Sequence, residues 1–196
     1  VVASQHARSA LITTRLVPLM KKYDFLSSHV AECVERLATE YQSPTAVRDI
    51  LADIASLTAA DLTYDTTGTR NLAGWLPEIA QRCPTLMLAN SSYLVSLLEC
   101  EVYSIRSAVV QALGILVMYA MHNEHNKQVQ QAAVQASSEA DGGECNDEGE
   151  AIVDETAQQE AAAMSVTTDA LLTILRERFR DVNAFTRART IGAWIS

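Results

Sequence analysis

The sequence has no uninterrupted apolar run of the roughly 18 residues that a membrane-spanning helix needs, so we expect no membrane contact. Its seven glycines are scattered, and none forms the closely spaced phosphate loop of the Walker type. The four cysteines, Cys33, Cys83, Cys100 and Cys145, form no C-x-x-C pair. Three of them lie within apolar patterns, which favours a reduced compartment over a disulfide framework.

Patterns for catalysis and metal binding are also missing. The one cluster with a metal-like composition is His122-Asn123-Glu124-His125, but its histidines are three residues apart and no third ligand is indicated. Apolar surroundings are expected to raise the thiol pKa of Cys33, Cys83 and Cys100, which is the reverse of what a nucleophile needs. We therefore expect no enzymatic activity, no metal and no cofactor.

Basic residues are absent from one long segment. Residues 128–165 hold nine acidic residues and no Lys or Arg, and removing those nine from the 24 acidic residues leaves 15 of each sign. The net charge of -9 therefore belongs to this segment. It also lacks aromatic residues, so it cannot bury enough apolar area to offset the entropy of ordering it. We expect a disordered insertion at 137–163, between helical repeats at 1–136 and their continuation at 164–196.

Apolar residues recur at helical spacing through most of the remaining chain. Val47, Ile50, Leu51 and Ile54 are one example of the i, i+3, i+4 pattern of an amphipathic helix. Further helices are predicted at about 71–82, 85–98 and 103–122, and no alternating strand pattern with turn signals occurs. The fold is therefore predicted to be all-α. The chain begins without Met and stops within a helical pattern, so we expect both ends to continue in a longer protein.

Two segments share one arrangement, in which an apolar helix and a polar turn precede a second helix that begins near Arg106 or Arg187. The two arginines lie 81 residues apart, and removing the 38 residues of 128–165 leaves 43. This distance falls inside the roughly 40–47-residue period of HEAT repeats, which predicts an α-solenoid of antiparallel helix pairs. Val47-Arg48 offers a looser third copy. The alignment predicts that Leu98, Leu113 and Trp194 are core residues.

The stretch from Phe179 to Trp194 allows two interpretations. In a stacked repeat, Asp181 and Asn183 can cap the second helix, while Arg106 and Arg187 reach the carboxylates of neighbouring turns. Alternatively, the arginines of this stretch bind phosphate. The turn does not explain four more arginines near this end, which form either a solvated face or a DNA phosphate contact: Arg176, Arg178, Arg180 and Arg189.

Four features stand in a specific order within residues 65–114 and 167–194. They are Asp65-Thr66-Thr67-Gly68-Thr69-Arg70, Pro84 with Leu88-Ala89-Asn90, Glu101-Val102-Tyr103 with Arg106, and Leu175 to Arg187 with Asp181-Val182-Asn183. With these features the two segments resemble the amino-terminal half of the condensin complex subunit 1 family, whose members are HEAT-repeat subunits. Thr186 and Gly192 stand where larger aliphatic residues are expected, which marks a divergent member.

The resemblance implies a non-catalytic scaffold in a ring-shaped complex that condenses and segregates mitotic chromosomes. Its implied partners are a kleisin and two SMC ATPases, with the ATP chemistry residing in the SMC subunits. It also implies a location in the nucleus and on chromosomes, with the cytoplasm in part of the cell cycle. An unrelated α-solenoid adaptor, of the transport or phosphatase scaffold type, stays open as the alternative.

Overall fold

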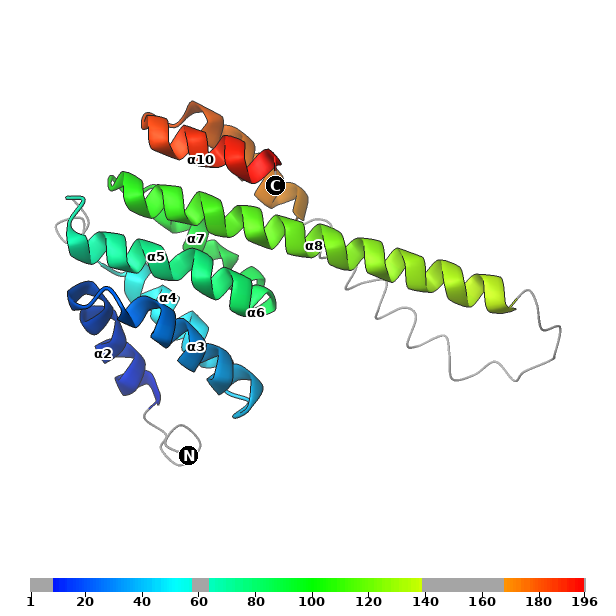
Figure 1. The fold of residues 1–196 in the computed structure, drawn as a ribbon, viewed down its shortest axis with the longest axis horizontal. Coiled ribbons are helices and arrows are strands. Elements are labelled where there is room, and N and C mark those ends of the chain that lie inside the picture. The colour runs from blue at the N-terminus through cyan, green and yellow to red at the C-terminus, as the bar shows by residue number, and fades with distance from the viewer. Residues whose placement is uncertain (1–8, 58–63, 139–167, 196) are drawn as a thin grey trace. The chain divides into compact units, whose positions relative to one another are not determined.

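The computed structural model describes residues 9–57, 64–138 and 168–195, and these residues form helices joined by turns (Figure 1). No strand occurs within these ranges. The expected all-α, HEAT-repeat solenoid is therefore confirmed. Of the acidic insertion expected at 137–163, all but the first two residues lie outside the described part of the chain.

Short connections join most of the successive helices. The elements are α2 (Ser9–Lys22), α3 (Leu26–Thr39), α4 (Thr45–Ala55), α5 (Thr67–Arg82), α6 (Pro84–Ala89), α7 (Ser91–Leu97), α8 (Tyr103–Ser138), a helical segment at 168–177, the 3-10 turn η1 (Arg178–Arg180) and α10 (Ala184–Ile195).

Local capping explains where α5 begins and ends. Thr66 has an extended backbone, and its Oγ1 accepts a hydrogen bond from the Thr69 backbone N at 3.2 Å, so α5 starts four residues before the predicted position. At the other end Pro84 starts α6, because a proline without an N–H is tolerated in the first turn of a helix.

The predicted single helix at 85–98 is wrong, because the chain breaks it at Asn90 into α6 and α7. The side-chain amide of Asn90 donates to the Leu86 carbonyl at 2.8 Å, a local bond that competes with the helical backbone pattern. The following helix is longer than the predicted 103–122, since good helix formers after Lys127 carry α8 to Ser138.

The described residues belong to two compact units, residues 1–116 with 174–196, and residues 117–173. In the first unit, α5 packs against α2 and α3, and α4 packs against α2 and α7. In Figure 1, α5, the first part of α8 and α10 run side by side. Among the large side chains with almost no exposed surface in this unit are Met20, Ile50, Leu51, Ile54, Leu72, Trp75, Leu76, Ile79, Met87, Leu94, Leu98 and Ile105.

The predicted core positions have different outcomes. Leu98 and Leu113 are buried, as the repeat alignment requires. Trp194 is 46% exposed, so its assignment to the core is wrong. Its ring instead lies against Phe179, with 5.9 Å between the ring centroids. A helix pattern shows which residues share a face, but a neighbouring element must be present to cover that face.

The second unit contains the later part of α8 and residues 168–173. Val117, Ala120, Thr168 and Leu171 are buried, whereas Met121 is half exposed. The unit therefore has few buried side chains among its described residues.

Residues Tyr103–Gln130 of α8 are long and apolar enough to cross a membrane, and 56% of their most apolar window is buried inside the protein. Ile105 and Val109 belong to the core of the first unit, and Arg106 forms an ion pair there. The first part of this helix therefore uses its apolar side chains for packing inside the first unit.

Candidate functional site

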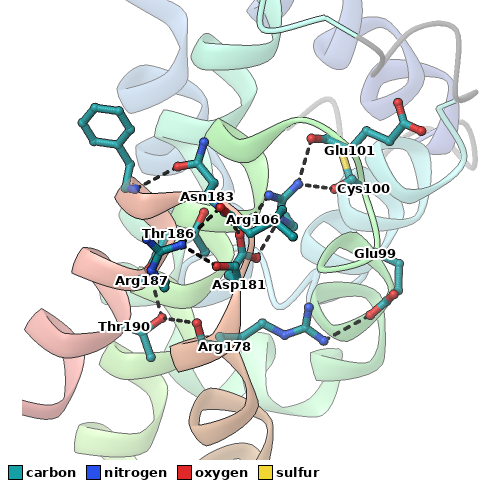
Figure 2. A network of polar contacts seen from close by, with 12 residues as sticks. Glu99, Cys100, Glu101, Arg106, Arg178, Asp181, Asn183, Thr186, Arg187 and Thr190 are labelled. Atoms are coloured by element: carbon teal, nitrogen blue, oxygen red, sulfur yellow. Dashed lines mark hydrogen bonds and ion pairs between the residues drawn. The ribbon is translucent and has the colours of Figure 1, made fainter.

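A buried ion pair joins the start of α8 to the turn before α10. Arg106 donates from Nε to Asp181 Oδ2 at 2.9 Å and from Nη2 to Asp181 Oδ1 at 3.0 Å (Figure 2). The two side chains are only 9% and 3% exposed. A two-pronged contact of this kind fixes both distance and orientation, so it sets how α8 and this turn meet.

Arg106 and Arg187 also hold the backbone in the same way. The Nη1 of Arg106 donates to the carbonyls of Cys100 and Glu101, at 2.8 and 2.7 Å. The Nη1 of Arg187 donates to the carbonyls of Asp181 and Val182, at 2.8 and 3.1 Å. In both cases the acceptors are six and five residues before the arginine, so each arginine closes the turn that leads into its own helix (Figure 2).

Asp181 and Asn183 form the turn itself. The backbone N of Asn183 donates to Asp181 Oδ1 at 2.8 Å, and Asn183 Oδ1 accepts from the Phe185 backbone N at 2.8 Å. The second bond satisfies one of the free N–H groups at the start of α10. Asp181 is therefore bonded to its own turn and to Arg106 at the same time, so its carboxylate has a structural role.

The charge of Asp181 is stabilised by its partners. Burial by itself would raise the pKa of this carboxyl group. Hydrogen bonds from Arg106 and the Asn183 backbone, together with the positive charges of Arg106 and Arg178, outweigh burial and hold the pKa of Asp181 below its ordinary value. The pair is therefore ionised at neutral pH.

The four remaining arginines have different surroundings. Arg178 donates to Glu99 at 3.2 Å, so it belongs to the same junction. Arg176, Arg180 and Arg189 are exposed and have no hydrogen bond or ion pair within the described ranges. These three remain available to bind an anionic partner, whereas the structure gives Arg178 a partner already.

The helix position of Arg106 and Arg187 recurs at two further arginines. Arg48, Arg70, Arg106 and Arg187 are each the fourth residue of their helix, α4, α5, α8 and α10. Arg48 belongs to the looser third copy predicted from the sequence, and it pairs with its neighbour Asp49 at 3.1 Å. Arg70 was missed by the repeat comparison, and it pairs with Asp65, with 2.7 Å between Nη2 and Oδ2. Position relative to the helix start was the signal that could have found Arg70.

A groove of about 540 Å³ lies between α5, α8 and α10. Its lining includes Gly74 and Pro77 from α5, Tyr103 and Gln111 from α8, and Arg189 from α10. Its described lining contains no acidic side chain. Of the four arginines singled out in the sequence, only Arg189 lines this groove.

The three cysteines that the structure describes, Cys33, Cys83 and Cys100, are free thiols. Burial raises the pKa of the Cys83 and Cys100 thiols. Cys33 lies exposed on α3, so the prediction of apolar surroundings for it is wrong. In the part of the chain that the structure describes, no three His, Cys, Asp or Glu side chains are placed to hold a metal ion.

Comparisons with known proteins identify the family. No family model matches the chain. The chain is 31% identical, over 91% of its length, to condensin-1 complex subunit CAP-D2 of Arabidopsis thaliana. It is 25% identical over 97% of its length to condensin complex subunit 1 of Mus musculus, and 21% identical over 97% to that of Schizosaccharomyces pombe. The chain belongs to the condensin subunit 1 family.

The chain corresponds to a small part of these relatives. It spans 11% of the Arabidopsis and mouse proteins and 14% of the Schizosaccharomyces pombe protein. The matches extend over nearly all of the chain, so they support the family assignment beyond residues 65–114 and 167–194, on which the resemblance was first based.

Several residues that line the groove between α5, α8 and α10 were not singled out from the sequence. Tyr103 and Phe185, near the starts of α8 and α10, lie with their ring centroids 5.9 Å apart. Gly74 and Pro77 are both unfavourable inside a helix, yet they stand three residues apart in the middle of α5. That pairing of two weak helix formers was the available signal for an unusual helix surface.

Proposed function

We propose that this chain is a non-catalytic scaffold segment of a condensin complex, on which the kleisin and the SMC ATPase subunits assemble. The segment contributes to mitotic chromosome condensation and segregation in the nucleus and on chromosomes. Its own residues supply rigid spacing and binding surface, and the ATP chemistry belongs to the SMC partners.

The observation that carries this proposal is the match to condensin subunits over 91% to 97% of the chain. The buried Arg106–Asp181 pair supports a scaffold role, because it fixes two successive helix pairs against each other. The same matches favour a condensin scaffold over an unrelated α-solenoid adaptor.

The proposal is tested by mixing the purified 196-residue chain with the purified kleisin subunit, and separately with the SMC pair, followed by size-exclusion chromatography. We expect the chain to elute with at least one of these partners at micromolar concentration. Elution of the chain alone in both mixtures would show that this segment is not the assembly surface.

DNA backbone contact is a second candidate function, supported by Arg176, Arg180 and Arg189, which are exposed and have no partner among the described residues. A guanidinium group without an internal partner is free to bind phosphate. Contacts to phosphate carry no base information, so this binding would be independent of base sequence.

A further inference from the structure

The groove between α5, α8 and α10 has an opening at Gly74. A Cβ atom added at Gly74 would have no heavy atom within 4 Å, and Gly74 is exposed. Ala73 and Ala108, which lie beside it in the lining, are buried. The floor of the groove is therefore apolar, and the missing side chain at Gly74 leaves room for a side chain of a bound molecule.

Pro77 lies on the same wall of the groove, together with Ala73. A proline has no N–H, so α5 lacks one helical hydrogen bond at this point, and the ring of Pro77 adds to the apolar lining.

The opposite side of the groove is polar and positively charged. Ser107 and Gln111 of α8 line it, and their side chains have no hydrogen-bond partner among the described residues. The only charged residue in the lining is Arg189, which is also unpaired within the described ranges. The groove therefore presents one uncompensated positive charge beside an apolar floor.

We infer that this groove binds an extended peptide segment of a partner protein, in which an aliphatic side chain lies next to an Asp or Glu. The aliphatic side chain enters above Gly74, and the carboxylate binds Arg189. The inference rests on the proposed scaffold function and identifies this groove as one of the surfaces through which the scaffold binds a partner. A single cation over an apolar floor fits a peptide better than DNA, which needs several phosphate contacts.

The test is a selection from a phage library of random peptides about twelve residues long, displayed against the immobilised 196-residue chain. The Gly74→Leu variant, whose added side chain fills the groove, serves as the counter-selection. Gly192→Leu is the matched control, because Gly192 is also exposed in a helix with no heavy atom within 4 Å of an added Cβ and lies outside the groove.

Enriched peptides are synthesised with a fluorophore, and their affinity is measured by anisotropy. We expect an aliphatic–acidic pair in the consensus and a loss of affinity of more than about tenfold with Gly74→Leu, against less than about twofold with Gly192→Leu. Arg189→Glu should weaken binding by about tenfold, and exchanging the peptide acid for Lys should restore it. Arg180→Glu, at an exposed arginine outside the groove, is the charge control.

Methyl NMR locates the bound peptide. The methyl signals of Ala73, Ala108 and Ala188, which all line the groove, should shift on titration, and that of Ala38, elsewhere in α3, should not. The inference is overturned if no peptide is enriched over the Gly74→Leu counter-selection. It is also overturned if a short DNA duplex, or a second copy of the chain, shifts the groove methyl signals while the selected peptide does not. Binding of the kleisin or SMC subunits that persists in Gly74→Leu would reject the groove and leave the proposed scaffold function intact.

Discussion

At the scale of single residues, Asp181 holds its own turn and the guanidinium group of Arg106 together. Truncating Arg106 to Ala would leave a buried carboxylate without its main partner, and breaking a buried pair in this way costs about 3–5 kcal/mol of unfolding free energy. The measurement is urea denaturation followed by circular dichroism. The matched control is Arg70→Ala, because Arg70 has the same helix position but its side chain is 61% exposed. Equal urea midpoints for the two variants would contradict the structural role of Arg106.

The same pair predicts how stability depends on pH. The folded-state pKa of Asp181 is lower than its ordinary value of 3.8, so the stability that this carboxylate contributes is fully present above that value and is lost as the pH falls through the folded-state pKa. Asp181→Asn should therefore differ from the parent chain most at neutral pH. We expect the difference in unfolding free energy to narrow as the pH falls below about 4. A difference that stays constant down to pH 2 would mean that Asp181 is not stabilised in its charged form.

At the scale of helices, α8 and α10 approach each other closely at one glycine. A Cβ atom added at Gly114 would lie 2.7 Å from the Cβ of Ala193, which is closer than two such atoms can pack. Gly114→Ala should therefore destabilise the protein although Ala is the better helix former. Gly74→Ala, with open space around the added atom, should stabilise it by about 0.5–1 kcal/mol.

Thermal unfolding measures the change in stability of each variant, which should be a loss for Gly114→Ala and a gain for Gly74→Ala. The double variant Gly114→Ala with Ala193→Gly should recover much of the lost stability, because it moves the methyl group from one helix to the other. If Gly114→Ala were as stabilising as Gly74→Ala, the close contact between α8 and α10 would be wrong.

Prediction of buried residues from the sequence failed where packing of neighbouring elements determines the exposure of a side chain. The period of α10 correctly places Trp194 on a face with other apolar residues, but the described chain leaves it 46% exposed beside Phe179. Cys33 lies in an apolar pattern on α3 yet faces outward. In both cases the pattern indicates a face of a helix, and only packing determines whether that face is covered.

At the scale of the whole molecule, the distribution of charge decides the DNA hypothesis. Reversing the three exposed arginines Arg176, Arg180 and Arg189 to Glu should weaken binding of a short duplex. Each lost phosphate contact should also reduce the slope of log affinity against log salt by about 0.9. Fluorescence anisotropy at several salt concentrations measures both quantities.

The control variant changes the net charge equally at another place. It reverses exposed basic residues of α2, α3 and α4, namely Lys22, Arg36 and Arg48. Equal affinities of the parent chain and both variants would remove DNA from the functions of this segment. Equal weakening in both variants would show an effect of net charge alone.

The sequence by itself determined the all-α class, the repeat relation between Arg106 and Arg187 and the family. The fold class and the repeat relation depend on local features, namely helical periodicity, capping residues and their spacing along the chain, whereas the family came from resemblance to known sequences. The same local reasoning recognised Asp181 and Asn183 as turn residues.

Only the tertiary structure decided which residues meet across the chain. Arg106 and Asp181 are 75 positions apart, and Gly74, Tyr103 and Arg189 come from three different helices. Helix packing brings such residues together, and its geometry depends on the shape of many side chains at once, so no spacing in the sequence specifies it. For the same reason the sequence grouped Arg178 with Arg189, whereas folding bonds Arg178 to Glu99 and places Arg189 in the lining of the groove.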